Sequence, residues 1–237
     1  MPLLLSDFNA QSLETVEPPK SSPRKWYYMI LGMLICITLL VVWRKNYYYD
    51  FFPKRWAVVY AGELYRSGQL SSSLVDRVLM DNQIDLVVDL TGVEPGNQDQ
   101  AAESEVCKKM LIEHHRFPLK GDGTGDLKTY ASAVHCIDQA IQNKKRVLVH
   151  CAAGIHRTGG VLAMYKLHVR GESPESVTEG LEEFGFWDEG VNAKLIPFLN
   201  HNRKALAEEV RKTGSTALNS QEVPLLGEHM ALTTDRE

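Results

Sequence analysis

The sequence has little cysteine and no strong excess of charge, and both shortages exclude classes of protein. Its four cysteines, Cys36, Cys107, Cys136 and Cys151, are too few and too scattered for a disulfide framework, and no pair has zinc-finger spacing. A formal net charge of −4 provides no broad basic surface of the kind that nucleic-acid binders carry. With 237 residues, 44% of them hydrophobic, the chain is long enough to bury one sizeable core.

Charge is also missing from one long stretch near the N-terminus. Residues 27–43 carry no charged side chain and would rise about 26 Å as a helix, enough to span a bilayer with interfacial anchors. A cleaved signal peptide fits poorly, because a long charged segment precedes the run and no small-residue cleavage site follows it. We predict a transmembrane helix over residues 26–43. Aromatic anchors flank it on both sides: Trp26, Tyr27 and Tyr28, then Trp43, Tyr47, Tyr48 and Tyr49.

The segments around this helix complete the predicted organisation. Residues 1–25 are polar and proline-containing and are expected to be a disordered tail. A juxtamembrane connector follows at 44–56, then a globular domain at 57–213 and a second disordered tail at 214–237. Basic residues flank the helix on both sides with a slight excess after it, which favours a cytoplasmic C-terminal part of a single-pass membrane protein.

Strand and helix patterns alternate in the globular domain. Strands are expected at 57–60, 64–66, 84–90, 117–119 and 146–149. Helices are expected after the serines at 71–73, around Val106, Met110 and Leu111 on one face, over 127–141, through 161–165, and from Ser173-Pro174. A final helix is expected over about 189–212, interrupted near Pro197. This alternation predicts an α/β fold with a central, mostly parallel sheet flanked by helices.

One ten-residue stretch carries the chemistry: HCAAGIHRTG, residues 150–159. A buried strand that turns through small residues into a helix directs backbone N–H groups and the positive helix end at one point, which suits an anion. Cys151 would be a thiolate nucleophile there, and Arg157 can grip two phosphoryl oxygens. Gly154 permits the turn. Thr158 can hydrogen-bond the sulfur and ease its departure from a covalent intermediate.

A cysteinyl-phosphate mechanism also needs a proton donor for the leaving oxygen. Asp122 lies in a glycine-flanked loop from which it could reach a bound phosphate. Asp126 directly precedes a helical pattern, so helix capping is its expected role. We predict Asp122 as the general acid. His156 either tunes the field of the loop, contacts substrate or faces solvent, and His150 is expected to fix the loop by hydrogen bonds.

The stretch resembles the active-site signature of the cysteine-based protein tyrosine phosphatase superfamily: His-Cys, five residues, Arg, then Ser or Thr and Gly. The layout over residues 57–205 is similar to a small dual-specificity phosphatase, and LYRSGQL is similar to a stretch of atypical bacterial and fungal members. The resemblance implies Cys151 as nucleophile, Arg157 as phosphate clamp, Thr158 as helper in hydrolysis and Asp122 as acid, with no metal and no cofactor. It also implies a phosphate-binding loop of Ala152, Ala153, Gly154, Ile155, His156 and Arg157.

The expected substrates are phosphotyrosine and phosphoserine or phosphothreonine of proteins, or a small phosphorylated molecule. No segment resembles the aromatic recognition loop or the glutamine-bearing loop of tyrosine-only phosphatases, which favours a shallow pocket. The loop also lacks the lysines of phosphoinositide-directed relatives. Three alternatives stay open: a phosphatase of inositol pyrophosphate, phosphoinositide or RNA 5′-triphosphate, a rhodanese-type sulfurtransferase, and an inactive phospho-binding module. A protective disulfide from Cys107 or Cys136 to Cys151 also stays open.

Overall fold

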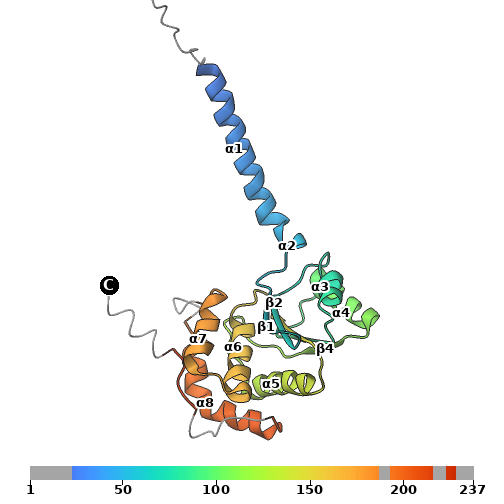
Figure 1. Cartoon of the computed structure of the whole chain (residues 1–237), viewed down its shortest axis with the longest axis vertical. Coiled ribbons are helices and arrows are strands. Elements are labelled where there is room, and N and C mark those ends of the chain that lie inside the picture. Colours follow the sequence, from blue (N-terminus) through green and yellow to red (C-terminus); the bar gives the residue numbers. More distant parts are fainter. Residues whose placement is uncertain (1–22, 187–192, 216–222, 228–237) are drawn as a thin grey trace, which may run out of the picture. The chain divides into compact units, whose positions relative to one another are not determined.

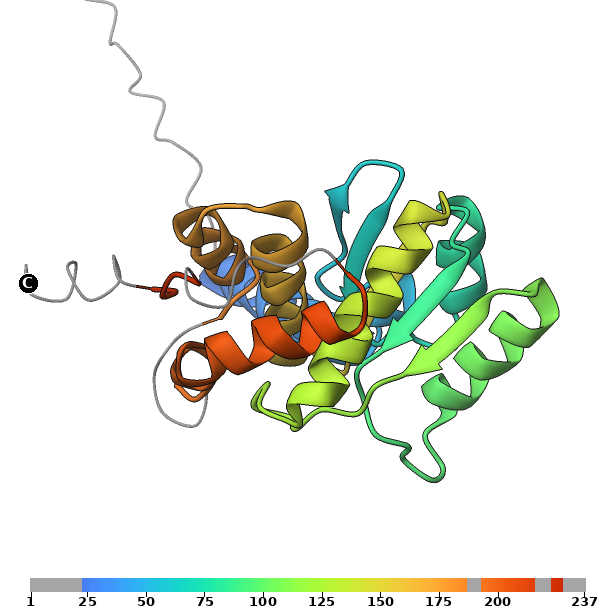
Figure 2. The same ribbon diagram turned by 90° about the horizontal axis from the view of Figure 1, so that it is seen from below.

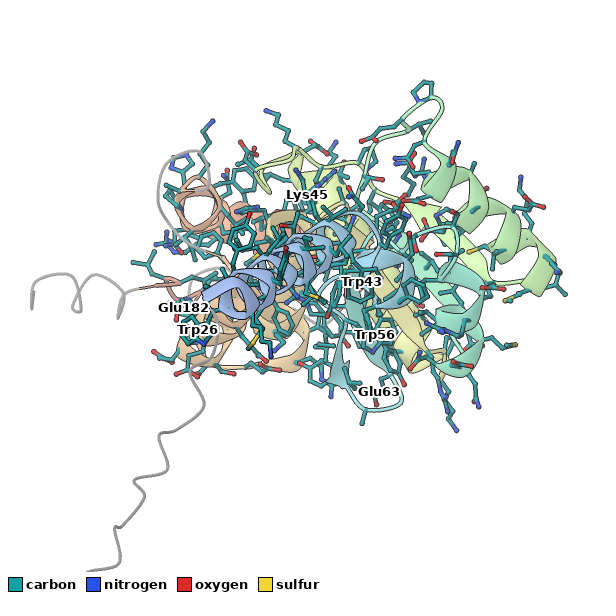
Figure 3. The ribbon with its side chains drawn as sticks, turned by 90° about the horizontal axis from the view of Figure 1, so that it is seen from above. Trp26, Trp43, Lys45, Trp56, Glu63 and Glu182 are labelled. Carbon is teal, nitrogen blue, oxygen red and sulfur yellow. The ribbon has the colours of Figure 1, made fainter. Side chains whose placement is uncertain are left out.

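The computed structural model describes residues 23–186, 193–215 and 223–227, and the chain divides into two units, residues 1–46 and 47–237. The first unit contains helix α1, Pro23–Asn46 (Figure 1). Its segment Lys25–Asn46 has a mean hydropathy of 2.1 and none of it is buried. Trp26 and Trp43 lie near the two ends of the helix (Figure 3). By length and composition α1 is able to cross a membrane, a test that signal sequences also pass.

The second unit is built on a five-stranded sheet (Figures 1 and 2). Its strands are β1 (Ala57–Tyr60), β2 (Leu64–Gly68), β3 (Leu86–Asp89), β4 (Glu113–Arg116) and β5 (Val147–Cys151), in the order β1-β2-β5-β3-β4. Strand β1 pairs antiparallel with β2, and the other three pairings are parallel. The predicted α/β class with a mostly parallel sheet is confirmed, and β5 lies at its centre.

Helices cover both faces of this sheet. The elements are α2 (Tyr48–Phe51), α3 (Val75–Asp81), α4 (Gln98–Met110), α5 (Leu127–Gln142), α6 (His156–Tyr165), the π-helix η1 (Lys166–Arg170), α7 (Pro174–Glu183) and α8 (Leu195–Lys212). Because side chains of a strand alternate between faces, Val147 and Val149 of β5 join the core formed with α5 to α8, whereas Leu148 joins the core formed with α3 and α4.

Local sequence explains where several helices begin. The side chain of Asn97 accepts hydrogen bonds from the backbone at the start of α4, and Asp126 does the same for Thr129 in α5. Ser173 caps α7, with Pro174 in its first turn, as predicted. The capping role of Asp126 is therefore confirmed.

Three element predictions were wrong in detail. The strand expected at 117–119 lies earlier, at Glu113–Arg116, because this edge strand is polar and half-exposed and shows no apolar run. Leu111 is not on a core face: it ends α4 in the left-handed conformation with 91% of its surface exposed. Helix α8 runs through Pro197 without interruption, because a first-turn proline loses no helical hydrogen bond; residues 189–192 of the predicted helix lie outside the described residues.

Residues 47–56 of the connector are bound to the globular domain by hydrogen bonds and ring stacking. The serines at 71–73 do not cap α3, whose N-cap is Leu74 without a side-chain bond. Instead, the hydroxyl groups of Ser71 and Ser73 donate to the carbonyls of Tyr49 and Asp50, at 3.0 Å each. The indole of Trp56 stacks on Tyr65 with ring centroids 5.6 Å apart. Residues 47–56 are thus part of the folded unit.

Part of the predicted C-terminal tail is also folded onto the domain. Residues 223–227 pack beside α8, where Val223 and Leu226 are buried in the core. The side chain of Asn200 donates to the carbonyl of Leu226 at 2.9 Å and accepts from its N–H at 2.8 Å. The expectation of disorder from residue 214 onward does not describe this segment.

Candidate active site

The candidate nucleophile stands at the carboxyl end of the central strand. Cys151 is the last residue of β5, between the parallel neighbours β2 and β3, and is 2% exposed. The chain then turns through residues 152–155 into α6. In open parallel sheets, ligands bind beyond the carboxyl ends of the strands where connections leave to either side. The sequence-predicted loop therefore occupies the expected place for a ligand.

The backbone of this loop closes around the sulfur. Gly154 has φ +74°, and its N–H lies 3.2 Å from the Cys151 sulfur. A Cβ atom on Gly154 would stand 2.6 Å from the backbone nitrogen of Gly68, so only glycine fits the turn. Ala152 and Ala153 are exposed, and the loop thus has an open outer side.

Electrostatics favour the thiolate form of Cys151. Burial opposes its ionisation, but the Thr158 hydroxyl, the Arg157 guanidinium and the backbone N–H groups of Thr158 and Gly154 outweigh burial and lower the pKa of the thiol. Thr158 is fully buried in the first turn of α6, where the helix dipole is positive. Nε of Arg157 is buried with no hydrogen-bond partner among the residues that the structure describes. The loop can therefore hold an oxyanion beside a nucleophilic sulfur.

A second, buried arginine supports the loop from the neighbouring strand. Arg66 of β2 is 4% exposed, and its Nη2 donates to the Gly154 carbonyl at 2.7 Å. Its guanidinium lies 3.7 Å from the centroid of the Phe184 ring. Burial, partly offset by the charges of Cys151 and Glu183, lowers the pKa of Arg66 to about 10. Arg66 was not singled out from the sequence, where its signals were a lone charge inside a strand pattern and its place in the stretch LYRSGQL.

Behind the nucleophile lies a buried ion pair. Nε2 of His150 is 3.0 Å from Oε1 of Glu103 on α4, and both side chains are fully buried. Burial alone would lower the pKa of His150, but Glu103, Asp89 and Cys151 raise it to about 9. His150 is thus buried in an ion pair with Glu103 on α4, a partner that the sequence did not reveal, and the predicted hydrogen bonds from His150 to the loop stay a prediction.

Asp122 belongs to the loop beside α6. Its carboxylate accepts from the N–H and hydroxyl of Thr124 at 3.0 and 2.8 Å and lies 3.7 Å from Lys194 Nζ. Burial acts against its ionisation, yet these bonds and the charges of Lys194 and Lys120 lower its pKa. A Cβ on Gly123 would be 3.1 Å from the His156 Cβ, so this loop packs on the first residue of α6.

His156 forms a wall of the site. Its ring is half-buried and meets Phe186 edge-on, with centroids 5.8 Å apart. Burial lowers the pKa of His156, Asp122 opposes this, and Arg157 and Arg55 add to it. His156 therefore shares its surroundings with the candidate acid and with two arginines.

A further cluster of polar side chains, on β3, α4 and β4, is better explained by ion pairs than by a bound metal ion. Side-chain ligand atoms of Asp89, Glu103 and His114 lie within 4.8 Å of one another. Asp89 however pairs with Arg116 at 2.7 Å, and Glu103 pairs with His150. The four cysteines are free, and Cys107 lies in the core on the other face of the sheet from Cys151.

Residues 68–171 match a family model described as a polymorphic toxin system DSP-PTPase phosphatase. The match covers less than half of the chain, and over these residues the chain is similar to cysteine-based phosphatases of the dual-specificity type. No curated protein matches the chain.

Solved structures share the fold of the globular unit. TpbA of P. aeruginosa has a TM-score of 0.50 at 24% identity, over 65% of this chain and 88% of that one. A TpbA structure in complex with pTyr has a TM-score of 0.51 at 21% identity, over 69% and 98%. The core catalytic domain of the PP-IP phosphatase SIW14 of S. cerevisiae, in complex with citrate, has a TM-score of 0.50 at 15% identity, over 67% and 94%.

Proposed function

We propose that this chain is a membrane-anchored phosphatase that hydrolyses phosphotyrosine and phosphoserine or phosphothreonine of proteins through a cysteinyl-phosphate intermediate. The observation that carries the proposal is the Cys151 thiol, whose pKa is lowered inside a loop that also presents Arg157. Thiolate and guanidinium together are what nucleophilic attack on a phosphate dianion requires.

In the first step, the Cys151 sulfur attacks phosphorus and the bond from phosphorus to the ester oxygen breaks. Arg157 and the loop N–H groups hold the equatorial oxygens, and Asp122 gives its proton to the leaving oxygen. In the second step, water attacks phosphorus, Asp122 takes the proton of the water, and the phosphorus–sulfur bond breaks. Thr158, which stabilises the thiolate, eases this departure.

The composition of the loop supports broad specificity. Its outer residues Ala152 and Ala153 are small and exposed, so they form no deep, selective wall. A shallow site admits the short phosphoserine side chain as well as phosphotyrosine. The likeness to TpbA and SIW14, at under 25% identity, concerns the fold and leaves the substrate to experiment.

The membrane part of the proposal rests on α1, which is apolar over a length sufficient to span a bilayer. We infer that the phosphatase domain is cytoplasmic, since a reactive thiolate persists better in a reducing compartment. Protease treatment of sealed membranes tests this: the domain should be digested in cytoplasm-out vesicles and protected in vesicles of the opposite orientation.

A substrate panel tests the activity. The purified full chain should hydrolyse an aryl phosphate and phosphopeptides without added metal, and vanadate should block it. Cys151→Ser should abolish turnover, whereas Cys136→Ser, which removes a half-buried thiol elsewhere, should retain it.

Turnover by Cys151→Ser would exclude the covalent mechanism. Faster hydrolysis of an inositol pyrophosphate, a phosphoinositide or a triphosphorylated RNA than of any phosphopeptide would refute the protein substrate, and sulfur transfer from thiosulfate would indicate a rhodanese.

A further inference from the structure

The connector that follows α1 reaches the phosphate loop. Arg55, nine positions beyond the end of α1 at Asn46, donates from Nη1 to the carbonyl of Ala153 at 3.0 Å. The preceding residue, Lys54, accepts a 2.7 Å hydrogen bond from the N–H of Gly68. A Cβ on Gly68 would lie 2.9 Å from that of Lys54 and 3.0 Å from the Ala153 carbonyl carbon, so connector, β2 and loop pack tightly together.

The backbone of Arg55 is held in an unusual conformation. Its φ is +48°, the left-handed region that non-glycine residues rarely adopt and that costs on the order of 1 kcal/mol. The Lys54 hydrogen bond before it and the Trp56–Tyr65 stack after it keep it there. Strained residues of this kind cluster at ligand sites, and this one places a guanidinium at the open side of the loop.

The Arg55 side chain has donors to spare. A guanidinium carries five N–H groups, and the Ala153 carbonyl uses one. The residue is exposed, and it forms no ion pair with a carboxylate of the described residues. Its charge also contributes to the low pKa of His156, which shows that it lies near the wall of the site.

Other positively charged side chains also lie around the open side of the loop. Arg157 belongs to the loop itself, and Lys194, with 64% of its side chain exposed, lies on the side of Asp122. Asp122 is the carboxylate that pairs with Lys194. Once Arg157 holds the scissile phosphate, Arg55 is an exposed cation beside the loop that has unused donors and, among the described residues, no carboxylate partner.

We propose that Arg55 binds an anionic side chain next to the phosphorylated residue, so that the preferred substrates are phosphopeptides with an adjacent acidic residue. This rests on the proposed phosphatase function. One guanidinium matches one carboxylate in fork geometry. A cluster of several phosphates would need more cations than the loop offers, since Ala152, Ala153 and Ile155 carry none.

Matched phosphopeptides test the proposal with the full chain in detergent micelles. In each pair, glutamate or glutamine precedes or follows the phosphorylated residue. The wild type should show a KM about fivefold lower for one of the glutamate peptides than for its glutamine partner, the upper range for an exposed ion pair. Arg55→Ala should reduce this ratio to about one, and Arg55→Lys should keep part of it.

Arg77→Ala is the control, because Arg77 also donates to a connector carbonyl, that of Phe51 at 3.0 Å, but is not part of the loop's surroundings. It should preserve both the ratio and the activity. A wild type without preference, or a preference that survives Arg55→Ala, would overturn the inference. So would an inositol polyphosphate that is hydrolysed better than the peptides in an Arg55-dependent manner. Failure of the proposed function would look different, since no phosphopeptide of either kind would then be cleaved.

Discussion

The ionisation of Cys151 depends on few side chains, and most of them are its neighbours in sequence. Burial to 2% exposure works against a thiolate, yet Thr158, Arg157 and two loop N–H groups reverse that effect. All of them lie within seven residues of the sulfur along the chain. Asp122, by contrast, comes from another loop, and its pKa is lowered by Thr124 and Lys194.

The ionisation states of Cys151 and Asp122 set opposite limits on the pH range of activity. The proposed attack requires ionised Cys151, so kcat/KM should rise as pH passes the lowered pKa of the thiol. It also requires protonated Asp122, whose pKa in the free protein is lowered as well, so kcat/KM should fall with further increase in pH. We predict an optimum on the acid side of neutrality, measured as kcat/KM against pH for an aryl phosphate.

Asp122→Asn should remove the falling limb and slow poor leaving groups about a hundredfold, with a much smaller effect on good ones. Asp126→Asn is the matched control, because Asp126 caps α5 and is exposed. If Asp126→Asn removed the falling limb and Asp122→Asn did not, the assignment of the acid would be reversed.

Among the elements, β2 supports the loop from the side. It supplies Arg66, which binds the Gly154 carbonyl, and Gly68, which leaves room for the loop backbone. The pairing of Ser67 with His150 and of Gly68 with Cys151 brings these groups to the carboxyl end of β5. The loop thus rests on a neighbouring strand as well as on its own helix.

Arg66→Met should therefore weaken catalysis without contact between residue 66 and substrate. It keeps the volume but leaves the buried Gly154 carbonyl without its donor, a loss of about 1–3 kcal/mol, and removes a positive charge that acts on Cys151. The rate of Cys151 alkylation by iodoacetamide, followed against pH, should show a higher thiol pKa.

Arg203→Met serves as the comparison, because Arg203 also donates to carbonyls, those of Val223 and Asn200, but at α8. It should leave the alkylation profile unchanged. An unchanged profile in Arg66→Met would mean that β2 supports the loop sterically and not through charge.

For the molecule as a whole, the His150–Glu103 pair joins the central strand to α4, which packs on one face of the sheet. The pKa of His150 is raised to about 9 in the folded state, from about 6.5 in an unfolded chain. A raised pKa stabilises the folded state fully below about pH 6.5, and this contribution is lost as pH rises through about 9. We predict that the free energy of unfolding falls over this window, measured by urea unfolding of the full chain in micelles.

Glu103→Gln should flatten that fall, and His150→Gln should cost about 3 kcal/mol because it leaves Glu103 buried without its cation. His115→Gln is the matched control: His115 and Glu113 lie 3.9 Å apart with about half of each side chain exposed. Its stability should follow the pH dependence of the wild type. If His115→Gln flattened the pH dependence of the free energy of unfolding as much as Glu103→Gln does, surface histidines would be its cause.

Strands that are buried along their whole length are predicted correctly from the sequence, whereas a half-exposed strand is not. The apolar runs of β3 and β5 lie in the middle of the sheet and predict strands correctly. The edge strand β4 reads EHHR, with alternating exposed and half-buried residues, and gave no apolar signal. Pro197 was misjudged because its effect depends on which turn of the helix it occupies.

The sequence by itself determined the loop of residues 150–159, because its parts are contiguous and act through local turns, backbone N–H groups and one helix end. Only the tertiary structure decided that Arg66, Glu103 and Arg55 meet this loop, from β2, α4 and the connector. Those contacts depend on which strands become neighbours when apolar surface is buried on both faces of the sheet. That arrangement is a property of the whole chain, so no single stretch of residues encodes it.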